Sequence, residues 1–227
     1  MRFSRSIFLC TVFCAALVAA LAAQDKANLL KEGKDENGDG KVETWVYSNN
    51  QAKIELIEAD DNGDGTVDKW RKFDTAGVPV VTESDSDFDG VLDTWIIFEN
   101  GVKVRQEKDQ NNDGNKDQIL YFDADGNKTK LEQDSKLNGK IDQILVFDAD
   151  GNKAEMQQDS NGDGVFDRWM EYYPSGKLKV VAYDTKGADG QKGSDGKPDV
   201  WQKYNEDGSK GQAGFDTTGD NQPDKWQ

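Results

Sequence analysis

Carboxylate and amide side chains recur along this chain at one fixed spacing. The first copy, Asp35-Glu-Asn-Gly-Asp-Gly-Lys-Val-Glu-Thr-Trp45, has oxygen-bearing side chains at positions 1, 3, 5 and 9, glycine at position 6 and tryptophan at position 11. Hard cations such as Ca²⁺ take several oxygen ligands of this kind. Three carboxylates about 4 Å apart repel one another by a few kcal/mol per pair at an effective dielectric of about 20. The spacing therefore favours cation binding over the alternative of simple Asp/Asn/Gly turns.

The pattern returns along the chain with a regular period. Further copies begin at Asp60, Asp85, Asp109, Asp134 and Asp159, so successive copies are 24 or 25 residues apart. A fixed period in this range predicts a repeat architecture. An active site would be expected to occur once, so carboxylates at a constant repeat position indicate copies of one binding site.

The copies differ in how complete their ligand sets are. Five carry an oxygen ligand at each of the four positions: Asp35, Asn37, Asp39, Glu43; Asp60, Asn62, Asp64, Asp68; Asp85, Asp87, Asp89, Asp93; Asp109, Asn111, Asp113, Asp117; and Asp159, Asn161, Asp163, Asp167. The fifth copy has Lys136 and Asn138 at positions 3 and 5, so we expect no ion there and an ammonium in its place. The seventh has Asp195 and Asp199 in register and is expected to lack acids at positions 1 and 3. The eighth offers a weaker set: Asp216, Asp220 and Asp224.

These loops resemble EF-hand calcium loops, in the D-x-[DN]-x-D-G form found in dockerins and thrombospondin type 3 repeats. An EF-hand adds a bidentate Glu at position 12, where Val46, Arg71 and Ile96 stand in this chain, and no helical pattern flanks the loops. The resemblance therefore implies Ca²⁺ as a structural staple, with dissociation constants on the order of 0.1–1 mM, and not a helix-opening switch. The turn Phe-Asp-Ala-Asp-Gly-Asn, at 122–127 and 147–152, is similar to YD-type hairpin repeats of bacterial surface shells.

Two strands and a glycine turn are expected to position each loop. Segments such as Asp93-Thr-Trp-Ile-Ile-Phe98 are rich in β-branched and aromatic residues, and a glycine turn and a second strand-like segment follow each of them. The sequence thus predicts an all-β fold, a repetitive antiparallel hairpin array forming a solenoid-like extended sheet. A closed, propeller-like ring is the alternative, because the pattern leaves half a repeat at each end.

Aromatic residues hold constant places in the repeat. All six tryptophans (45, 70, 95, 169, 201 and 226) occupy position 11, where Ile119 and Ile144 replace them in two copies. A structural ladder is favoured over a carbohydrate-binding strip, since isoleucine substitutes for tryptophan. The Phe or Tyr three residues later would point to the opposite face of a flat strand, so either both faces carry aromatics or a bulge resets the phase.

The N-terminal segment and the charge limit where the chain works. Residues 1–23 combine a basic start, an apolar run and a small-x-small motif typical of a secretory signal peptide, with a membrane anchor as the alternative. Removal of this segment with Arg2 and Arg5 leaves 26 basic and 44 acidic residues, a net charge of −18. We expect no nucleic-acid partner and no stable membrane insertion after cleavage. Both cysteines lie in this segment and the chain has no histidine, which removes thiol catalysis and the commonest general base.

Together these features predict a signal peptide, 1–23, followed by about eight calcium-loop hairpin repeats, 24–227, with an insertion near 185–194. The expected function is that of an exported calcium-binding repeat protein, secreted, periplasmic or at the cell surface, with a structural or adhesive role. Partners would be surface proteins or glycans. The alternative is a carbohydrate- or cell-wall-binding module that uses an exposed tryptophan row. The chain is not expected to be an enzyme.

Overall fold

The computed structural model describes residues 26–185 and 195–227, so the predicted signal peptide and most of the predicted insertion lie outside the described residues. The chain divides into two compact units, residues 1–82 and 83–227, called here the N-terminal and C-terminal units. Among the described residues, no helix has the length and apolar character needed to cross a membrane.

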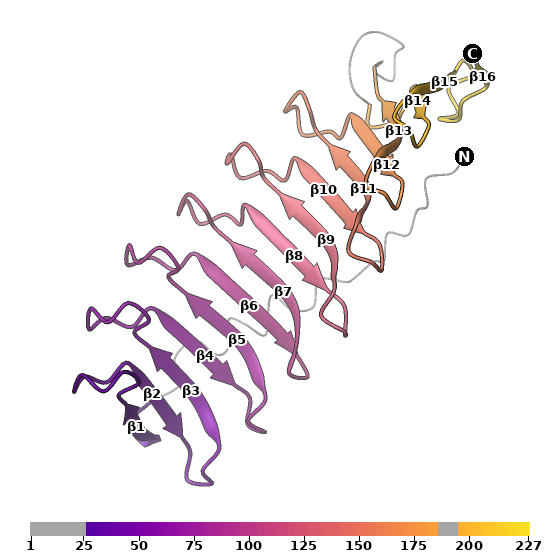
Figure 1. The fold of residues 1–227 in the computed structure, drawn as a ribbon. Coiled ribbons are helices and arrows are strands. Elements are labelled where there is room, and N and C mark those ends of the chain that lie inside the picture. The colour runs from indigo at the N-terminus through magenta and orange to yellow at the C-terminus, as the bar shows by residue number, and fades with distance from the viewer. Residues whose placement is uncertain (1–25, 186–194) are drawn as a thin grey trace. The chain divides into compact units, whose positions relative to one another are not determined.

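Antiparallel strands make up the fold (Figure 1). In the N-terminal unit a short 3-10 helix, η2 (Lys26–Asn28), precedes β1 (Leu30–Lys34), β2 (Thr44–Ser48), β3 (Ile54–Ala59) and β4 (Lys69–Phe73). Strand β5 (Pro79–Ser84) spans the boundary. The C-terminal unit holds β6 (Thr94–Glu99), β7 (Val102–Lys108), β8 (Gln118–Phe122), β9 (Lys128–Gln133), β10 (Gln143–Phe147), β11 (Lys153–Gln158), β12 (Arg168–Tyr172), β13 (Leu178–Tyr183), β14 (Val200–Tyr204), β15 (Lys210–Phe215) and β16 (Lys225–Trp226).

Neighbouring strands in each unit pair in chain order, which confirms the predicted all-β hairpin array. The strand order is linear in each unit, and the first and last strands of a unit do not pair with each other. The alternative of a closed, propeller-like ring is therefore wrong for the described chain. Because the connections alternate, acidic loops lie at one end of the strands, called here the loop end, and glycine turns lie at the other (Figure 1).

The glycine turns follow from backbone geometry. Between β6 and β7, Asn100 and Gly101 both have positive φ, 52° and 80°, as a two-residue type I′ hairpin requires. Between β8 and β9, Asp123 accepts the N–H groups of Asp125 and Asn127 on one carboxylate oxygen, at 3.0 and 2.9 Å. These local bonds set each hairpin without a thick core.

A bulge recurs beside most glycine turns, but it does not reset the phase between the tryptophan and the following aromatic residue. In the β6–β7 pair, Ile97 faces Arg105 but Phe98 faces Lys103, so the extra residue lies on the second strand. Equivalent shifts occur in the β8–β9, β10–β11 and β12–β13 pairs. The tryptophan and the following aromatic are thus on a regular strand, and its partner strand is the one that bends.

Within each unit the tryptophans lie in one cross-strand row but are not direct neighbours. In the N-terminal unit Glu58 lies between Trp45 and Trp70. In the C-terminal unit Ala182 lies between Trp169 and Trp201. The predicted ladder is therefore an alternating row, in which a residue of the neighbouring strand separates each tryptophan from the next.

Candidate metal sites in the acidic loops

The acidic loops of the eight copies are numbered here in chain order. They are loop 1 (35–43), loop 2 (60–68), loop 3 (85–93), loop 4 (109–117), loop 5 (134–142), loop 6 (159–167), loop 7 (184–199) and loop 8 (216–224). Each joins an odd-numbered strand to the next even-numbered strand. Loops 1 and 2 belong to the N-terminal unit and loops 3–8 to the C-terminal unit.

Backbone hydrogen bonds close each loop and connect it to its neighbour within a unit. In loop 4 the N–H of Asp117 donates to the carbonyl of Lys108 at 2.8 Å, which closes the neck. The N–H of Asp134, at position 1 of loop 5, donates to the carbonyl of Asp117 at 2.8 Å. The same bond joins Asp159 to Asp142 at 2.9 Å. Successive loops of the C-terminal unit are therefore held in one orientation.

The aspartate at position 1 organises the interior of its loop. In loop 6 the two carboxylate oxygens of Asp159 accept the N–H groups of Gly162 and Gly164, at 2.6 and 2.8 Å. Both glycines have positive φ, 82° and 95°, which turns their N–H groups inward. Asp159 is 5% exposed. A buried carboxylate surrounded by N–H donors is the arrangement an EF-hand-like loop needs at its first ligand.

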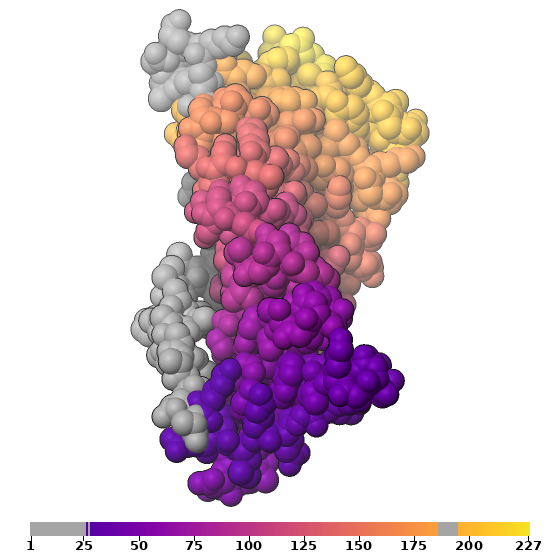
Figure 2. All heavy atoms as spheres, turned by 90° about the vertical axis from the view of Figure 1, so that its left-hand side faces the viewer, coloured from indigo at the N-terminus to yellow at the C-terminus, as the bar shows by residue number. Residues whose placement is uncertain are grey.

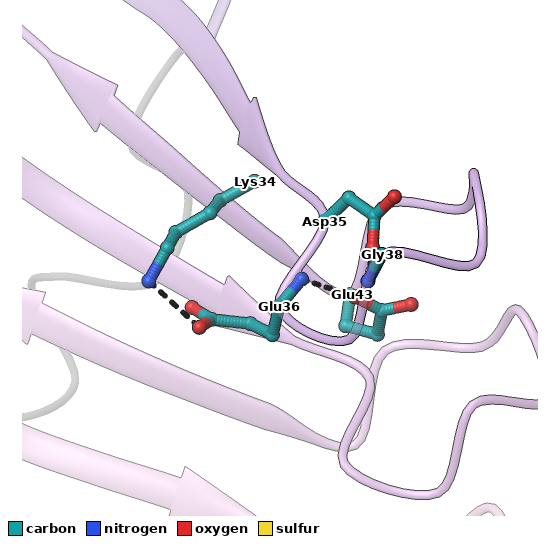
Figure 3. Close-up of polar contacts among 5 residues, drawn as sticks. All are labelled: Lys34, Asp35, Glu36, Gly38 and Glu43. Carbon is teal, nitrogen blue, oxygen red and sulfur yellow. Dashed lines mark hydrogen bonds and ion pairs between the residues drawn. The ribbon is translucent and has the colours of Figure 1, made fainter.

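The acid at position 9 spans the neck of the loop. Its carboxylate accepts the N–H of position 2, at 2.7 Å from Ser86 to Asp93 in loop 3 and at 2.8 Å from Glu36 to Glu43 in loop 1 (Figure 3). The Ser86 hydroxyl adds a bond of 2.8 Å. Although burial raises the pKa of Asp93, the donors from Thr94 and Ser86 outweigh it and lower that pKa.

Positions 3 and 5 form the exposed rim. In loop 2 the side chain of Asn62 accepts the N–H of Asp64 at 2.8 Å, and Asp64 accepts the N–H of Thr66 at 2.7 Å. The latter bond is the main reason that the pKa of Asp64 is lowered. These local bonds fix the side chains at positions 3 and 5 to the backbone of the loop.

Three acidic side chains converge in two loops of the described chain. Carboxylate oxygens of Asp35, Asp39 and Glu43 lie within 4.8 Å of one another, and so do those of Asp85, Asp87 and Asp89. Partial desolvation, and then the neighbouring carboxylate of Asp89, raise the pKa of Asp87, although its side chain is exposed. The like charges of loop 3 therefore oppose the ionisation of Asp87.

Loop 4 contains a buried oxygen with no hydrogen-bond partner. Asp117 is 0% exposed, and its Oδ2 accepts the N–H of Gln110 at 2.6 Å. Its Oδ1 has no hydrogen-bond partner within the described part of the chain. A buried carboxylate oxygen without a partner is costly, and a bound cation would supply the missing interaction.

In loops 2, 4 and 6 the amide at position 3 replaces an acid, and its NH₂ group donates to the carboxylate at position 5. The distances are 3.1 Å from Asn62 to Asp64, 3.1 Å from Asn111 to Asp113 and 3.0 Å from Asn161 to Asp163. Rotation of each amide would present its oxygen in place of its nitrogen. These loops can therefore offer the four predicted oxygen ligands.

Loop 5 departs from the expectation that Lys136 fills the place of a metal in its own loop. Its Nζ donates to the backbone carbonyl of Asp159 in loop 6, at 3.0 Å. The backbone N–H groups of Lys136 and Asn138 still donate to the carboxylate of Asp134, at 3.1 and 2.8 Å. Loop 5 thus keeps the backbone conformation of the other loops, while the ammonium group of Lys136 binds loop 6 instead of its own loop.

Loop 7 contains a candidate ligand, at the start of the seventh copy, that the ligand set predicted from the sequence leaves out. Asp184, which is 8% exposed, accepts the N–H groups of Asp195 and Gly196, both at 2.7 Å. It therefore occupies position 1, and the expectation that loop 7 lacks an acid there is wrong. The signal was its place after the strand-like segment 178–183, but 10 residues separate it from Asp195. Residues 186–194 lie outside the described chain.

The eighth loop keeps the same local bonds with fewer ligands. Asp216 accepts the N–H groups of Gly219 and Asn221, at 2.6 and 2.8 Å. Asp224 is exposed and accepts the N–H of Thr217 at 2.7 Å, and Asp220 accepts the N–H of Gln222 at 3.0 Å.

The tryptophan row is not an open platform. Trp201 is 4% exposed, and each of the other five is half-buried. Lysine ammonium groups lie over three rings: Lys31 over Trp45 at 5.2 Å, Lys116 over Trp95 at 3.0 Å and Lys203 over Trp226 at 3.7 Å. A glycan would have to displace these lysines, so the geometry gives the strip no support.

No protein family model matches this chain, and no curated protein matches it. Among solved structures, the chain is similar to one reported as "Crystal structure of accessory secretory protein 1,2 and 3 in Streptococcus pneumoniae". The sequence identity is 17% and the TM-score is 0.36, over 53% of this chain and 21% of the solved chain. This chain therefore matches about a fifth of that protein's length.

Proposed function

We propose that this chain is an exported calcium-binding repeat protein in which Ca²⁺ makes the acidic loops rigid and so fixes successive hairpins. The observation that carries the proposal is the fully buried carboxylate of Asp117, whose Oδ1 has no partner among the described residues. The converging acids of loops 1 and 3 support it. In each case a bound divalent ion would balance charge that the surrounding side chains leave unbalanced.

Calcium is favoured by the chemistry of the donors. The chain has no histidine, and both cysteines lie in the predicted signal peptide, so carboxylate, amide and carbonyl oxygens remain. Six to eight oxygens at about 2.3–2.6 Å suit Ca²⁺, whereas Mg²⁺ demands a tighter octahedron. No acid at position 12 completes an EF-hand, so each ion would keep open positions for water.

A structural or adhesive role follows from where the loops lie. Each loop connects two hairpins, and its neck is already closed by backbone bonds. An ion would link the acid at position 1 and the rim at positions 3 and 5 to the position-9 acid at the neck. The bend between hairpins would then resist local opening, which is useful to an exported protein without a disulfide.

Calcium titration into chelated protein tests this proposal. The half-buried tryptophans follow the loops by two residues, so we expect a saturable change in tryptophan fluorescence and a rise in the thermal midpoint. Mg²⁺ at the same ionic strength is the control and should have a smaller effect. No change of either signal at 10 mM Ca²⁺ would contradict the proposal.

A further inference from the structure

Three large apolar side chains are exposed at the loop end of the C-terminal unit. Phe88 and Val91 in loop 3 are 49% and 48% exposed, and Leu137 in loop 5 is 42% exposed. Among the described residues of this unit, only Val102, at a glycine turn, is also a large exposed hydrophobic residue. Single exposed apolar residues are common in proteins, so their position must decide whether they matter.

The backbone at Phe88 and Leu137 is unfavourable for such residues. Both occupy position 4 of their loops, with φ of 63° and 51°. At the same position loop 6 has Gly162, with φ of 82°. Bulky L-residues rarely adopt this left-handed conformation, which glycine takes freely. The backbone conformation at Phe88 and Leu137 therefore costs stability, and both side chains are nevertheless exposed.

Hydrogen bonds connect the loops that carry these side chains. The Asn112 side chain of loop 4 donates to Asp89 of loop 3 at 2.7 Å, and Asn111 donates to the carbonyl of Leu137 at 3.4 Å. Loop 4 therefore bridges the loops that carry Phe88 and Leu137. Figure 2 looks onto the loop end, where these loops follow one another in magenta and pink.

The charge around the apolar side chains identifies the kind of partner. Loops 3 and 4 contain seven carboxylates and one lysine, and Asp87, Asp89 and Asp113 are exposed. One divalent ion in each loop would still leave this region negative. An anionic membrane is therefore repelled, whereas a cationic surface is attracted.

We propose that loops 3–5 form a docking surface for a basic amphipathic protein segment. Apolar residues of the segment cover Phe88, Val91 and Leu137, and its lysine or arginine side chains face Asp87 and Asp89. The loop-to-loop hydrogen bonds preorganise the surface, so little conformational entropy is lost on docking. The side chains of Phe88, Val91 and Leu137 are not calcium ligands, whereas Asp87 and Asp89 are proposed ligands, so the docking surface shares its charged groups with the calcium site of loop 3 and rests on the negative charge that remains after an ion binds.

A labelled 14-residue amphipathic peptide of lysine and leucine is the probe, and fluorescence anisotropy at physiological ionic strength and 1 mM Ca²⁺ is the measurement. The test variant combines Phe88→Gly with Leu137→Gly, and Val102→Ser removes an exposed apolar residue elsewhere. We expect the test variant to bind at least tenfold more weakly than wild type, and Val102→Ser to bind as wild type does. Thermal midpoints of the test variant should not fall, because glycine suits both positions.

Equal binding of the test variant and wild type would overturn the proposal, because attraction would then be to bulk charge. Preferred binding to a glutamate–leucine peptide, or to phosphatidylserine vesicles, would also overturn it. Calcium stoichiometry measured on the same samples keeps the two proposals apart. If the wild-type protein binds no calcium, the calcium proposal is refuted, whereas the docking proposal still depends on the peptide measurement.

Discussion

Asp117 is fully buried, and one of its carboxylate oxygens accepts no hydrogen bond within the described chain. A turn that only reverses the chain direction would not need this charge. The N–H of Gln110, across the neck of the loop, donates to Oδ2 of Asp117 at 2.6 Å. Oδ1 of Asp117 is then left for a ligand. A buried carboxylate with an unpaired oxygen is therefore the feature that best distinguishes a calcium loop from a simple turn.

Asp117→Asn should have opposite effects with and without calcium. In chelator, removal of a buried charge should leave the free energy of unfolding unchanged or raise it by about 1 kcal/mol. At 10 mM Ca²⁺ the variant should be less stable than wild type by about 1–3 kcal/mol, because one bound ion is lost. Urea unfolding under both conditions measures this, with Asp125→Asn in an exposed turn as control. The same difference in both conditions would refute the role of Asp117.

Phe88→Gly should stabilise the protein. Relief of the left-handed conformation outweighs the greater freedom of glycine in the unfolded chain, for a net gain of about 0.5–1 kcal/mol. Gly90→Ala, at a position with φ of 92°, is the matched opposite and should destabilise by about 1 kcal/mol. Thermal unfolding compares the two, and destabilisation by Phe88→Gly would show that the ring is needed for packing.

Loop 5 is the element that separates loop geometry from ion binding. It keeps Asp134 and Asp142 at positions 1 and 9, but Lys136 reaches the carbonyl of Asp159 at 3.0 Å. The double substitution Lys136→Asn with Asn138→Asp restores the ligand set of loops 2, 4 and 6. Equilibrium dialysis should then find one additional Ca²⁺ per chain. Asn138→Asp alone is the control, and an unchanged count in the double variant would show that side-chain identity does not create a site.

Strands β2 and β3 are joined by a buried pair that predicts alkaline sensitivity. The hydroxyl of Tyr47 donates to Glu58 at 2.7 Å, and Lys26 forms an ion pair with the same carboxylate. Burial, and then the bond to Glu58, raises the pKa of Tyr47 from 10.0 to about 12. The unfolded chain therefore loses this proton first as pH rises.

Stability from Tyr47 should be fully present below pH 10 and be lost as pH rises toward 12. Thermal midpoints between pH 9 and pH 11.5 should fall more steeply for wild type than for Tyr47→Phe. At pH 8 the variant should be less stable by about 1 kcal/mol, because the Glu58 bond is lost. Parallel pH curves for the two proteins would refute the assignment.

For the whole molecule, the sequence predicted the hairpins and loops because their determinants are local. Gly162 and Gly164 specify the loop backbone, and residues such as Asn100-Gly101 specify the turns. Three features depended on pairing across strands and could not be read from local sequence. These are the recurring bulge, the path of Lys136 into loop 6, and the use of Asp184 across an insertion.

The number of Ca²⁺ ions that the whole molecule binds is expected to equal the number of loops with a full ligand set. Five loops do, and five divalent ions would reduce the net charge of −18 predicted for the processed chain to −8. Equilibrium dialysis against 5 mM Ca²⁺, with metal counted by mass spectrometry, measures the ions directly. We expect about five Ca²⁺ per wild-type chain and one fewer in Asp117→Asn. Fewer than one ion per wild-type chain would contradict it.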